Sequence, residues 1–370
     1  MKKTIRGRSF YEAKQYETTF QFLAGIDKLE TFPVGILSDL LSKDAAALYR
    51  WLYESQNQSV LTNVLGSGER ELSLSYSATT TDYFAAGYCL AHSNCTWTIY
   101  LDSADDVVME FLSKGCNHQL PETGISSQFV LVSFKKGSIT DEGIRHFLTI
   151  PRPLLQSIEQ LDFSSSKLDR RGCECLAEGI QRMSCLAILD LSGNLEIGNG
   201  DAVKLVSSLH SSKLTKLDMS GTSISDPDFE CLASYIRSSA SLEELKIRRT
   251  KISVKSIDAL CKALNINSSM RKLDMWGCQL TDLHSVHLGQ LLREPVHCRI
   301  EKLVLTSCNL TSNGLGKIVT GLCDNHTLKE LIIRDNQMND VAVATMLQKN
   351  SSLQRLNLEN VKLKSVAVWS

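Results

Sequence analysis

One apolar pattern recurs along the C-terminal two thirds of the chain. In each copy an apolar residue is followed by two variable residues, a second apolar residue, one variable residue and a third apolar residue, before a short polar stretch. Copies begin at Ile158, Leu186, Leu214, Leu242, Met270, Ile300, Leu328 and Leu353, and a weaker copy begins at Phe129. Most starts are 28 residues apart. Self-similarity at such a period predicts a repeat architecture.

Each copy predicts a strand followed by a turn. In the third copy the alternation sends Leu217 and Met219 to the core and Asp218 to the opposite face. The ninth position carries a small polar or thiol side chain, which we expect to satisfy backbone groups of the turn. These residues are Asn194, Thr222, Thr250, Cys278, Cys308 and Asn336.

The segments between the strands are amphipathic and predict helices. We expect the helix over 226–240 to have Asp226 as its N-cap with Pro227 next. Over 254–264, the apolar residues at helical spacing are Ile257, Leu260, Cys261 and Leu264. One strand and one helix cannot bury their apolar faces alone, so the repeats must stack, with parallel strands on one side and helices on the other.

This pattern resembles the leucine-rich repeat family, of the ribonuclease-inhibitor type, over 129–370 in about nine repeats. The resemblance implies an α/β solenoid curved into a horseshoe, with strands on the concave side and helices on the convex side. The chain departs from the pattern at Val361, at Glu196 and Ile197, where one residue is inserted, and over 283–297, which is two residues longer.

Residues 1–128 lack the repeat. We expect a helical region over 1–90, in which Leu48, Trp51 and Leu52 share an apolar face. A cap over 91–128 contains a strand (97–101) and a helix (105–115). FQFLAGI (20–26), ALYRWLYESQN (47–57) and GYCLAHSNCTW (87–97) resemble the region that joins the NACHT module to the repeats in NOD-like receptors.

The NOD-like resemblance implies the C-terminal part of such a receptor. No G-x-x-x-x-G-K-[ST] loop occurs, and NGLGK (313–317) has the wrong spacing. We therefore expect no nucleotide site and no cofactor in this chain, with nucleotide acting only through an absent upstream module.

Charge and composition narrow the classes of partner. The 40 basic and 41 acidic residues leave a net charge of -1, which argues against a nucleic-acid binder. The sequence has no run of 18 apolar residues, which predicts a protein without a membrane span. No apolar stretch follows the basic start, which predicts a protein without a secretory signal. We therefore expect a cytoplasmic protein with reduced thiols. The N-x-S/T triplets at Asn57, Asn94, Asn267, Asn309, Asn325 and Asn350 then have no glycosylation role.

The candidate site is the outward side of the strands, where we expect protein partners to bind. An outer row contains Arg248, Trp276, Thr306 and Arg334, and a second row contains Asp218, Lys246, Asp274, Val304 and Ile332. Exposed Trp and Arg on a rigid surface are typical of a binding hot spot. The alternative is that Trp276 only covers the stems of neighbouring Lys and Arg residues. We expect Trp276→Ala to leave folding intact.

Two clusters could suggest metal. Cys89, His92 and Cys95 have C-x2-H-x2-C spacing, with Cys116 and His118 further on, but a packed junction with buried thiols fits the small, apolar surroundings better than zinc. His284, His287, His297 and Cys298 are better explained by a surface helix. No nucleophile elbow is present and the carboxylates are spread by the repeat, so we expect no enzyme.

Two functions remain open. The first is the ligand-sensing or autoinhibitory half of a NOD-like innate-immune receptor. The alternative is a stand-alone scaffold or enzyme inhibitor similar to ribonuclease inhibitor. The receptor interpretation expects exposed apolar surface within residues 1–90, because missing neighbours would cover it.

Overall fold

The computed structural model describes residues 44–74, 77–122, 124–293, 298–338 and 340–363. The chain divides into two compact units. The first unit runs through Asp162 and includes residues 182–185, and the second contains residues 163–181 and those from Leu186 onward. The segment FQFLAGI lies outside the described residues, and the predicted boundaries at 90 and 128 stay predictions.

Strands and helices alternate in the first unit. In order its elements are α4 (Ala45–Ser55), α5 (Gln58–Leu65), β1 (Ser67–Ser73), α6 (Thr80–His92), β2 (Asn94–Tyr100), α7 (Asp106–Cys116), β3 (Gln128–Ser133), α8 (Asp141–Leu148), α9 (Arg152–Ser157) and β4 (Gln160–Asp162). The four strands pair in parallel and in sequence order. The predicted strand over 97–101 and helix over 105–115 are found as β2 and α7.

Helix α4 shows how the first unit is built. The Asp44 side chain accepts a hydrogen bond from the Ala47 amide at 3.1 Å, which fixes the start of the helix. The apolar face predicted for Leu48, Trp51 and Leu52 is confirmed, since all three are buried. Strand β1 was not predicted, because its sequence SGERELS lies next to Gly66 and lacks β-branched and aromatic residues.

The second unit repeats one strand and one helix. Its elements are α10 (Arg170–Ile180), β5 (Ile188–Asp190), α11 (Val203–Ser208), the 3-10 helix η1 (Leu209–Ser211), β6 (Lys216–Asp218), α12 (Asp226–Ser238), β7 (Glu244–Lys246), α13 (Val254–Ile266), β8 (Lys272–Asp274), α14 (Asp282–Arg293), β9 (Lys302–Val304), α15 (Ser312–Leu322), β10 (Glu330–Ile332), β11 (Gln337–Met338), α16 (Asp340–Lys349), β12 (Arg355–Asn357) and β13 (Lys362–Leu363).

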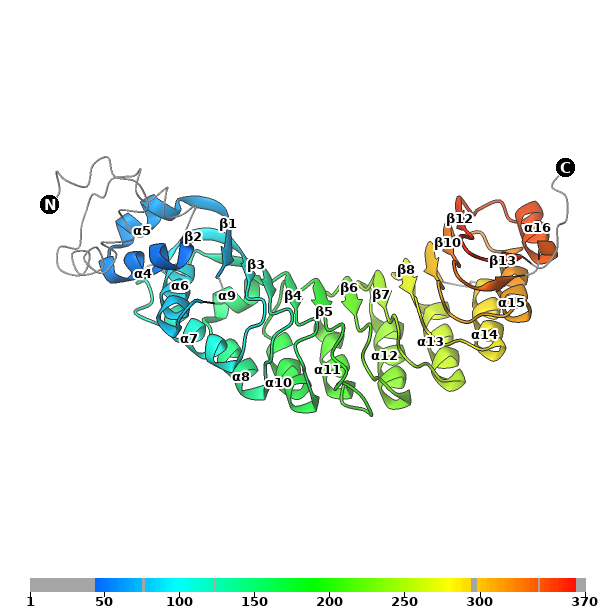
Figure 1. Ribbon diagram of the computed structural model, residues 1–370, viewed down its shortest axis with the longest axis horizontal. Coiled ribbons are helices and arrows are strands. Elements are labelled where there is room, and N and C mark those ends of the chain that lie inside the picture. Colours follow the sequence, from blue (N-terminus) through cyan, green and yellow to red (C-terminus); the bar gives the residue numbers. More distant parts are fainter. Residues whose placement is uncertain (1–43, 75–76, 123, 294–297, 339, 364–370) are drawn as a thin grey trace. The chain divides into compact units, whose positions relative to one another are not determined.

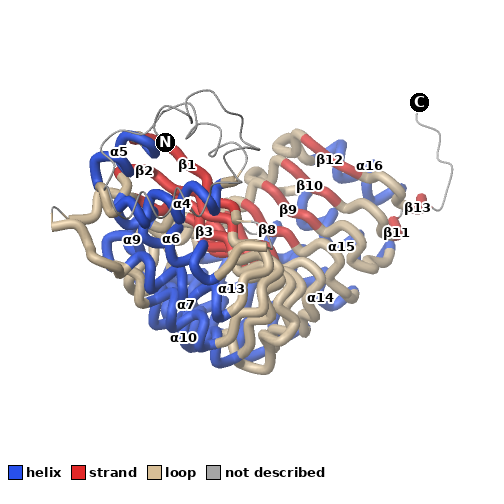
Figure 2. The backbone as a smooth tube through the Cα atoms, turned by 60° about the vertical axis from the view of Figure 1, so that its left-hand side comes forward, coloured by secondary structure: helices blue, strands red, loops and turns tan. Residues whose placement is uncertain are grey.

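Strands β5 to β10 and then β12 pair in parallel, while β11 pairs with β13. Within this unit the strands lie on one side and the helices on the other (Figure 1), and β8, β9, β10 and β12 lie side by side as successive rungs (Figure 2). The predicted α/β solenoid is confirmed. Its core is a ladder of equivalent leucines, such as Leu217, Leu245 and Leu273, which are in register and buried.

The helices confirm the predicted pattern, with one correction. All four apolar residues predicted to face the core from α13 are buried. Helix α12, however, is capped by Ser225, whose amide and hydroxyl donate to the Asp228 carboxylate at 2.9 and 3.0 Å. Asp226 is not the N-cap. Its carboxylate accepts from the hydroxyls of Ser253 and Ser256 in the next repeat, at 2.6 Å each.

The ninth position satisfies turn backbone groups, as predicted. The Asn336 amide donates to the carbonyls of Leu305 and Ile333, and its oxygen accepts from the amides of Cys308 and Leu310. Where the residue is a threonine or a cysteine, the hydroxyl or thiol donates instead to the carbonyl of the residue that follows a strand. This position therefore holds the chain where it leaves the strand.

Three of the N-x-S/T triplets share one structural role. Asn267, Asn325 and Asn350 each follow a helix, and their side-chain amides donate to backbone carbonyls one repeat earlier. Their oxygens accept from the amides two and three residues further on. These asparagines thus close the turn from helix back to strand, which explains why the triplets recur.

Candidate partner-binding surface

The outward residues at the ends of β6 to β10, with the outward residues two positions further along the chain, form what we call the strand face. Register places Lys246, Asp274, Val304 and Ile332 on neighbouring strands, with Asp218 beside Lys246. The outer row is also continuous, because the residue after each member donates its amide to the carbonyl of the next member. The two predicted rows therefore exist in the second unit.

Most charges on the strand face are already paired. Arg248 donates from Nε and Nη2 to Asp274 Oδ2, at 2.9 and 2.6 Å, and this bonding raises the pKa of its guanidinium. Lys246 lies 3.5 Å from the Asp218 carboxylate, and Arg334 lies 3.0 Å from Glu359. Each of these three cations of the predicted site therefore already has an acidic partner.

The aspartates of the second row also have a local role that sequence reasoning missed. Asp218 accepts from the Ser220 amide at 2.9 Å, and Asp274 accepts from the Trp276 amide at 3.1 Å. A short side chain that bonds the backbone two residues on fixes a turn. The recurrence of Asp at one repeat position was the available signal.

Trp276 is half-buried and is covered on one side by a residue that was not predicted. The Arg249 guanidinium carbon lies 4.2 Å from the centre of the indole. Arg249 has φ +55, in the left-handed region that favours small residues. At the same place in other repeats the chain has Ser165, Gly193, Gly221, Gly277, Ser307, Asp335 and Asn360. A bulky residue in this backbone conformation costs energy, which makes Arg249 an exception among the repeats.

Gly277 makes room for this pair. A Cβ at Gly277 would lie 3.1 Å from Arg249 Cγ. On the other side of Trp276 the strand face offers little accessible side-chain surface, since Val304 and Thr306 are each only 8% exposed. The accessible part of the strand face is therefore centred on Trp276 and Arg249, with the half-buried Ile332 further along.

The suspected metal residues contact protein groups instead. The Cys89 and Cys95 thiols donate to the carbonyls of Tyr49 and Gly66, and the His92 ring bridges the carbonyls of Tyr88 and Gln119. The interpretation as a packed junction is confirmed by this burial. In the described part of the chain, no three His, Cys, Asp or Glu side chains gather as a metal-binding group.

The second suspected cluster is spread over separate contacts. His284 is buried between Thr281 and the Ile252 carbonyl, and His287 lies 3.2 Å from Asp258. His297 lies outside the described residues. Cys298 is buried, and burial raises the pKa of its thiol.

Comparison with known proteins agrees with the repeat fold. A family model described as "Leucine Rich repeat" matches residues 210–233 and 324–346. The chain is a leucine-rich repeat protein with an α/β solenoid. It resembles the C-terminal part of a NOD-like receptor, and it is a protein-interaction module related to those receptors. An internalin structure from Listeria monocytogenes aligns at a TM-score of 0.43, with 11% identity over 90% of this chain and 89% of that one, which is too loose to bear on function.

The similar curated proteins are NACHT, LRR and PYD domains-containing proteins. Human protein 12 is 23% identical over 88% of this chain and 30% of its own length, and rat protein 3 is 23% identical over 87% and 32%. Mouse protein 14 is 25% identical over 63% of this chain and 21% of its own length. The chain thus spans about a third or less of the length of these relatives.

No helix among the described residues is long and apolar enough to cross a membrane.

The receptor interpretation can be compared with the exposure of apolar side chains near the N-terminus. The large apolar side chains of residues 44–74 and 77–90 are buried or half-buried. The exposed apolar surface expected there by the receptor interpretation is therefore not found in this part, and residues 1–43 lie outside the described ones.

Proposed function

We propose that the chain recognises a protein partner through the strand face, with Trp276 and Arg249 at the centre of the contact. The single observation that carries this is the Arg249 guanidinium, which stacks on the half-buried Trp276 from a left-handed backbone position. Aromatic and arginine residues dominate binding hot spots, and a side chain that already packs against another loses less entropy on binding. Recognition rather than catalysis is proposed, because the carboxylates nearby hold turns and ion pairs.

We further propose that this contact belongs to the ligand-sensing or autoinhibitory half of a NOD-like innate-immune receptor in the cytoplasm. The similarity over 88% of the chain to human NACHT, LRR and PYD domains-containing protein 12 supports this. Nucleotide would then act through a separate module, and this chain would need neither cofactor nor nucleic acid. The buried thiols fit a reducing compartment.

The alternative is a free-standing scaffold or enzyme inhibitor similar to ribonuclease inhibitor. The absence of exposed large apolar side chains in the described part of residues 44–90 favours it. An immunoblot of native protein with an antibody against the repeats separates the two. A band near 41.1 kDa supports the free-standing protein, and a much larger band supports the receptor.

Site-specific photo-crosslinking tests the surface itself. A benzoyl-phenylalanine at position 276 is expected to trap a discrete partner in cells. The same probe at Lys262, exposed on the helix side in α13, is the matched control. A partner trapped at Lys262 but never at position 276 would place the contact on the helices and refute the proposal.

A further inference from the structure

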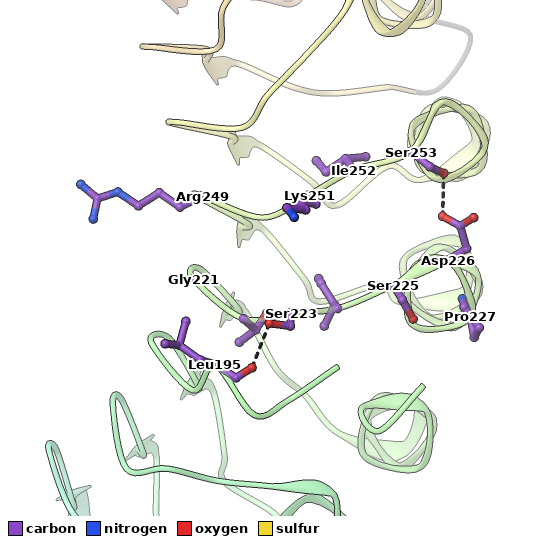
Figure 3. A pocket seen from close by; sticks show the side chains of 12 residues that line it. Leu195, Gly221, Ser223, Ser225, Asp226, Pro227, Arg249, Lys251, Ile252 and Ser253 are labelled. Atoms are coloured by element: carbon purple, nitrogen blue, oxygen red, sulfur yellow. Dashed lines mark hydrogen bonds between the residues drawn. The ribbon is translucent and has the colours of Figure 1, made fainter. Parts of the chain in front are cut away.

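A groove lies among the strand-to-helix loops of the second unit, away from the helices' outer side (Figure 3). It is lined by residues 221–227, by Arg249 and residues 251–253, and by Leu195 from the preceding repeat, and its volume is about 760 Å³. Ligand pockets have volumes of roughly 300–1,000 Å³. The groove is therefore large enough to hold several side chains of a partner.

The groove exists because two neighbouring loops are not joined. The Ser223 amide donates to the Ile197 carbonyl at 2.7 Å, and Gly198 and Ser223 form a parallel bridge. Across the described repeats, no such backbone bond joins 223–225 to 251–253. Further along, the Leu280 amide again donates to the Cys308 carbonyl. Residues 251–253 also have no backbone bond to residues 279–281, so among the described residues this loop is joined to neither neighbouring loop.

The lining combines apolar surface with one available cation. Ile224 and Ile252 form a buried floor, and Leu195 is 70% exposed. Lys251 is exposed and makes no ion pair within the described residues. Arg249 extends outward from its loop, away from the other lining side chains (Figure 3), so it belongs to the strand face.

The acidic group of the groove is already hydrogen-bonded within the protein. Asp226 accepts hydrogen bonds from Ser253 and Ser256, and this bonding lowers the pKa of its carboxyl. The Ser223 hydroxyl donates to the Leu195 carbonyl at 2.8 Å. The groups that remain for a ligand are the Lys251 ammonium and the exposed Leu195 side chain.

We propose that this groove docks an extended segment of a protein partner in which an acidic residue lies next to an apolar one. The carboxylate meets Lys251 and the apolar side chain covers Leu195. These two residues are two repeats apart, roughly 10 Å at the spacing of strands, which about three extended residues span. The inference shares with the proposed function only the premise that the chain binds proteins, because its residues are different.

The test is a selection of phage-displayed random heptapeptides on the full chain, followed by fluorescence anisotropy with the selected peptides. We expect sequences with Asp or Glu beside Leu, Ile, Val or Phe. Reversing the charge with Lys251→Glu should weaken binding about tenfold or more, because like charges then face each other. Lys213→Glu, at another exposed lysine, should leave the affinity unchanged.

A second pair of variants tests the apolar contact. Leu195→Ser should weaken the selected peptides severalfold, and Leu283→Ser, at another leucine that is 63% exposed, should not. Peptides with Asp replaced by Lys should regain affinity for the Lys251→Glu variant. Circular dichroism of each variant checks that it is folded.

The outcomes also separate this proposal from the strand-face contact. Peptides that bind in the groove should tolerate Trp276→Ala. Selected peptides that lack acidic residues, or that ignore both Lys251→Glu and Leu195→Ser, overturn the groove proposal. If such peptides are instead lost with Trp276→Ala, the groove proposal fails while the strand-face proposal is supported.

Discussion

Replacing Asn336 by alanine tests the physical account of the repeat turn. The Asn336 side chain is buried, and it accepts from the amides of Cys308 and Leu310 at 3.1 Å each. It also donates to the carbonyls of Leu305 and Ile333, at 2.8 and 3.0 Å. Alanine offers neither donor nor acceptor, so four buried backbone groups lose their side-chain partner.

The expected loss in the free energy of unfolding follows from these unpaired backbone groups. A buried donor or acceptor left without a partner costs about 1–3 kcal/mol, so the two amides alone give about 2–6 kcal/mol. Water that enters the vacated space recovers part of this. We therefore expect Asn336→Ala to lower the free energy of unfolding by about 3 kcal/mol, which corresponds to a factor of about 150 in an equilibrium constant.

Urea unfolding followed by circular dichroism measures the loss, and hydrogen exchange locates it. The amides of Cys308 and Leu310 should exchange about a hundredfold faster in the variant. Asn63→Ala, at an exposed asparagine of α5, is the control and should change stability by less than about 0.5 kcal/mol. A loss below about 1 kcal/mol with unchanged exchange would show that these bonds do not hold the turn.

Two other predictions concern glycines and thiols. Gly321→Ala should destabilise the protein, because the added Cβ would lie 2.1 Å from a backbone oxygen of α14. Gly316→Ala in the same helix meets nothing within 4 Å and should stabilise the protein by up to about 1 kcal/mol. Thermal unfolding of the two variants compares these effects. Burial raises the pKa of the Cys116 and Cys173 thiols to about 12, so mass spectrometry after iodoacetamide treatment should find the exposed Cys185 labelled first. Labelling of Cys116 before unfolding would contradict the packing described.

The repeat made most of the second unit predictable. An apolar residue at a fixed period identifies a buried strand position such as Leu273 regardless of what surrounds it, because every repeat must fill the same core. Local capping was less predictable. Ser225 and Asp226 are both good N-caps, and the choice between them depends on the bonds from Ser253 and Ser256, which belong to another repeat.

The candidate site was predictable as a surface but not as a set of contacts. Alternation alone placed Trp276 on the outward side. Which cation would lie against it depends on backbone conformation, and the sequence pattern does not show that Arg249 is left-handed. The groove beside Lys251 was missed for a similar reason, because it results from hydrogen bonds absent between two particular loops of the described chain.

The central claim is that Trp276 contacts a partner and does not belong to the core. The most direct measurement compares Trp276→Ala with Leu273→Ala. Both variants are measured in thermal unfolding and in affinity for the partner trapped by crosslinking at position 276. Losing an exposed cation–π contact costs about 0.5–1 kcal/mol, and emptying a buried leucine site costs about 2–5 kcal/mol. The account predicts a Tm within a few degrees of the parent protein for Trp276→Ala, with affinity at least tenfold weaker. A Tm as low as that of Leu273→Ala, or an unchanged affinity, would contradict it.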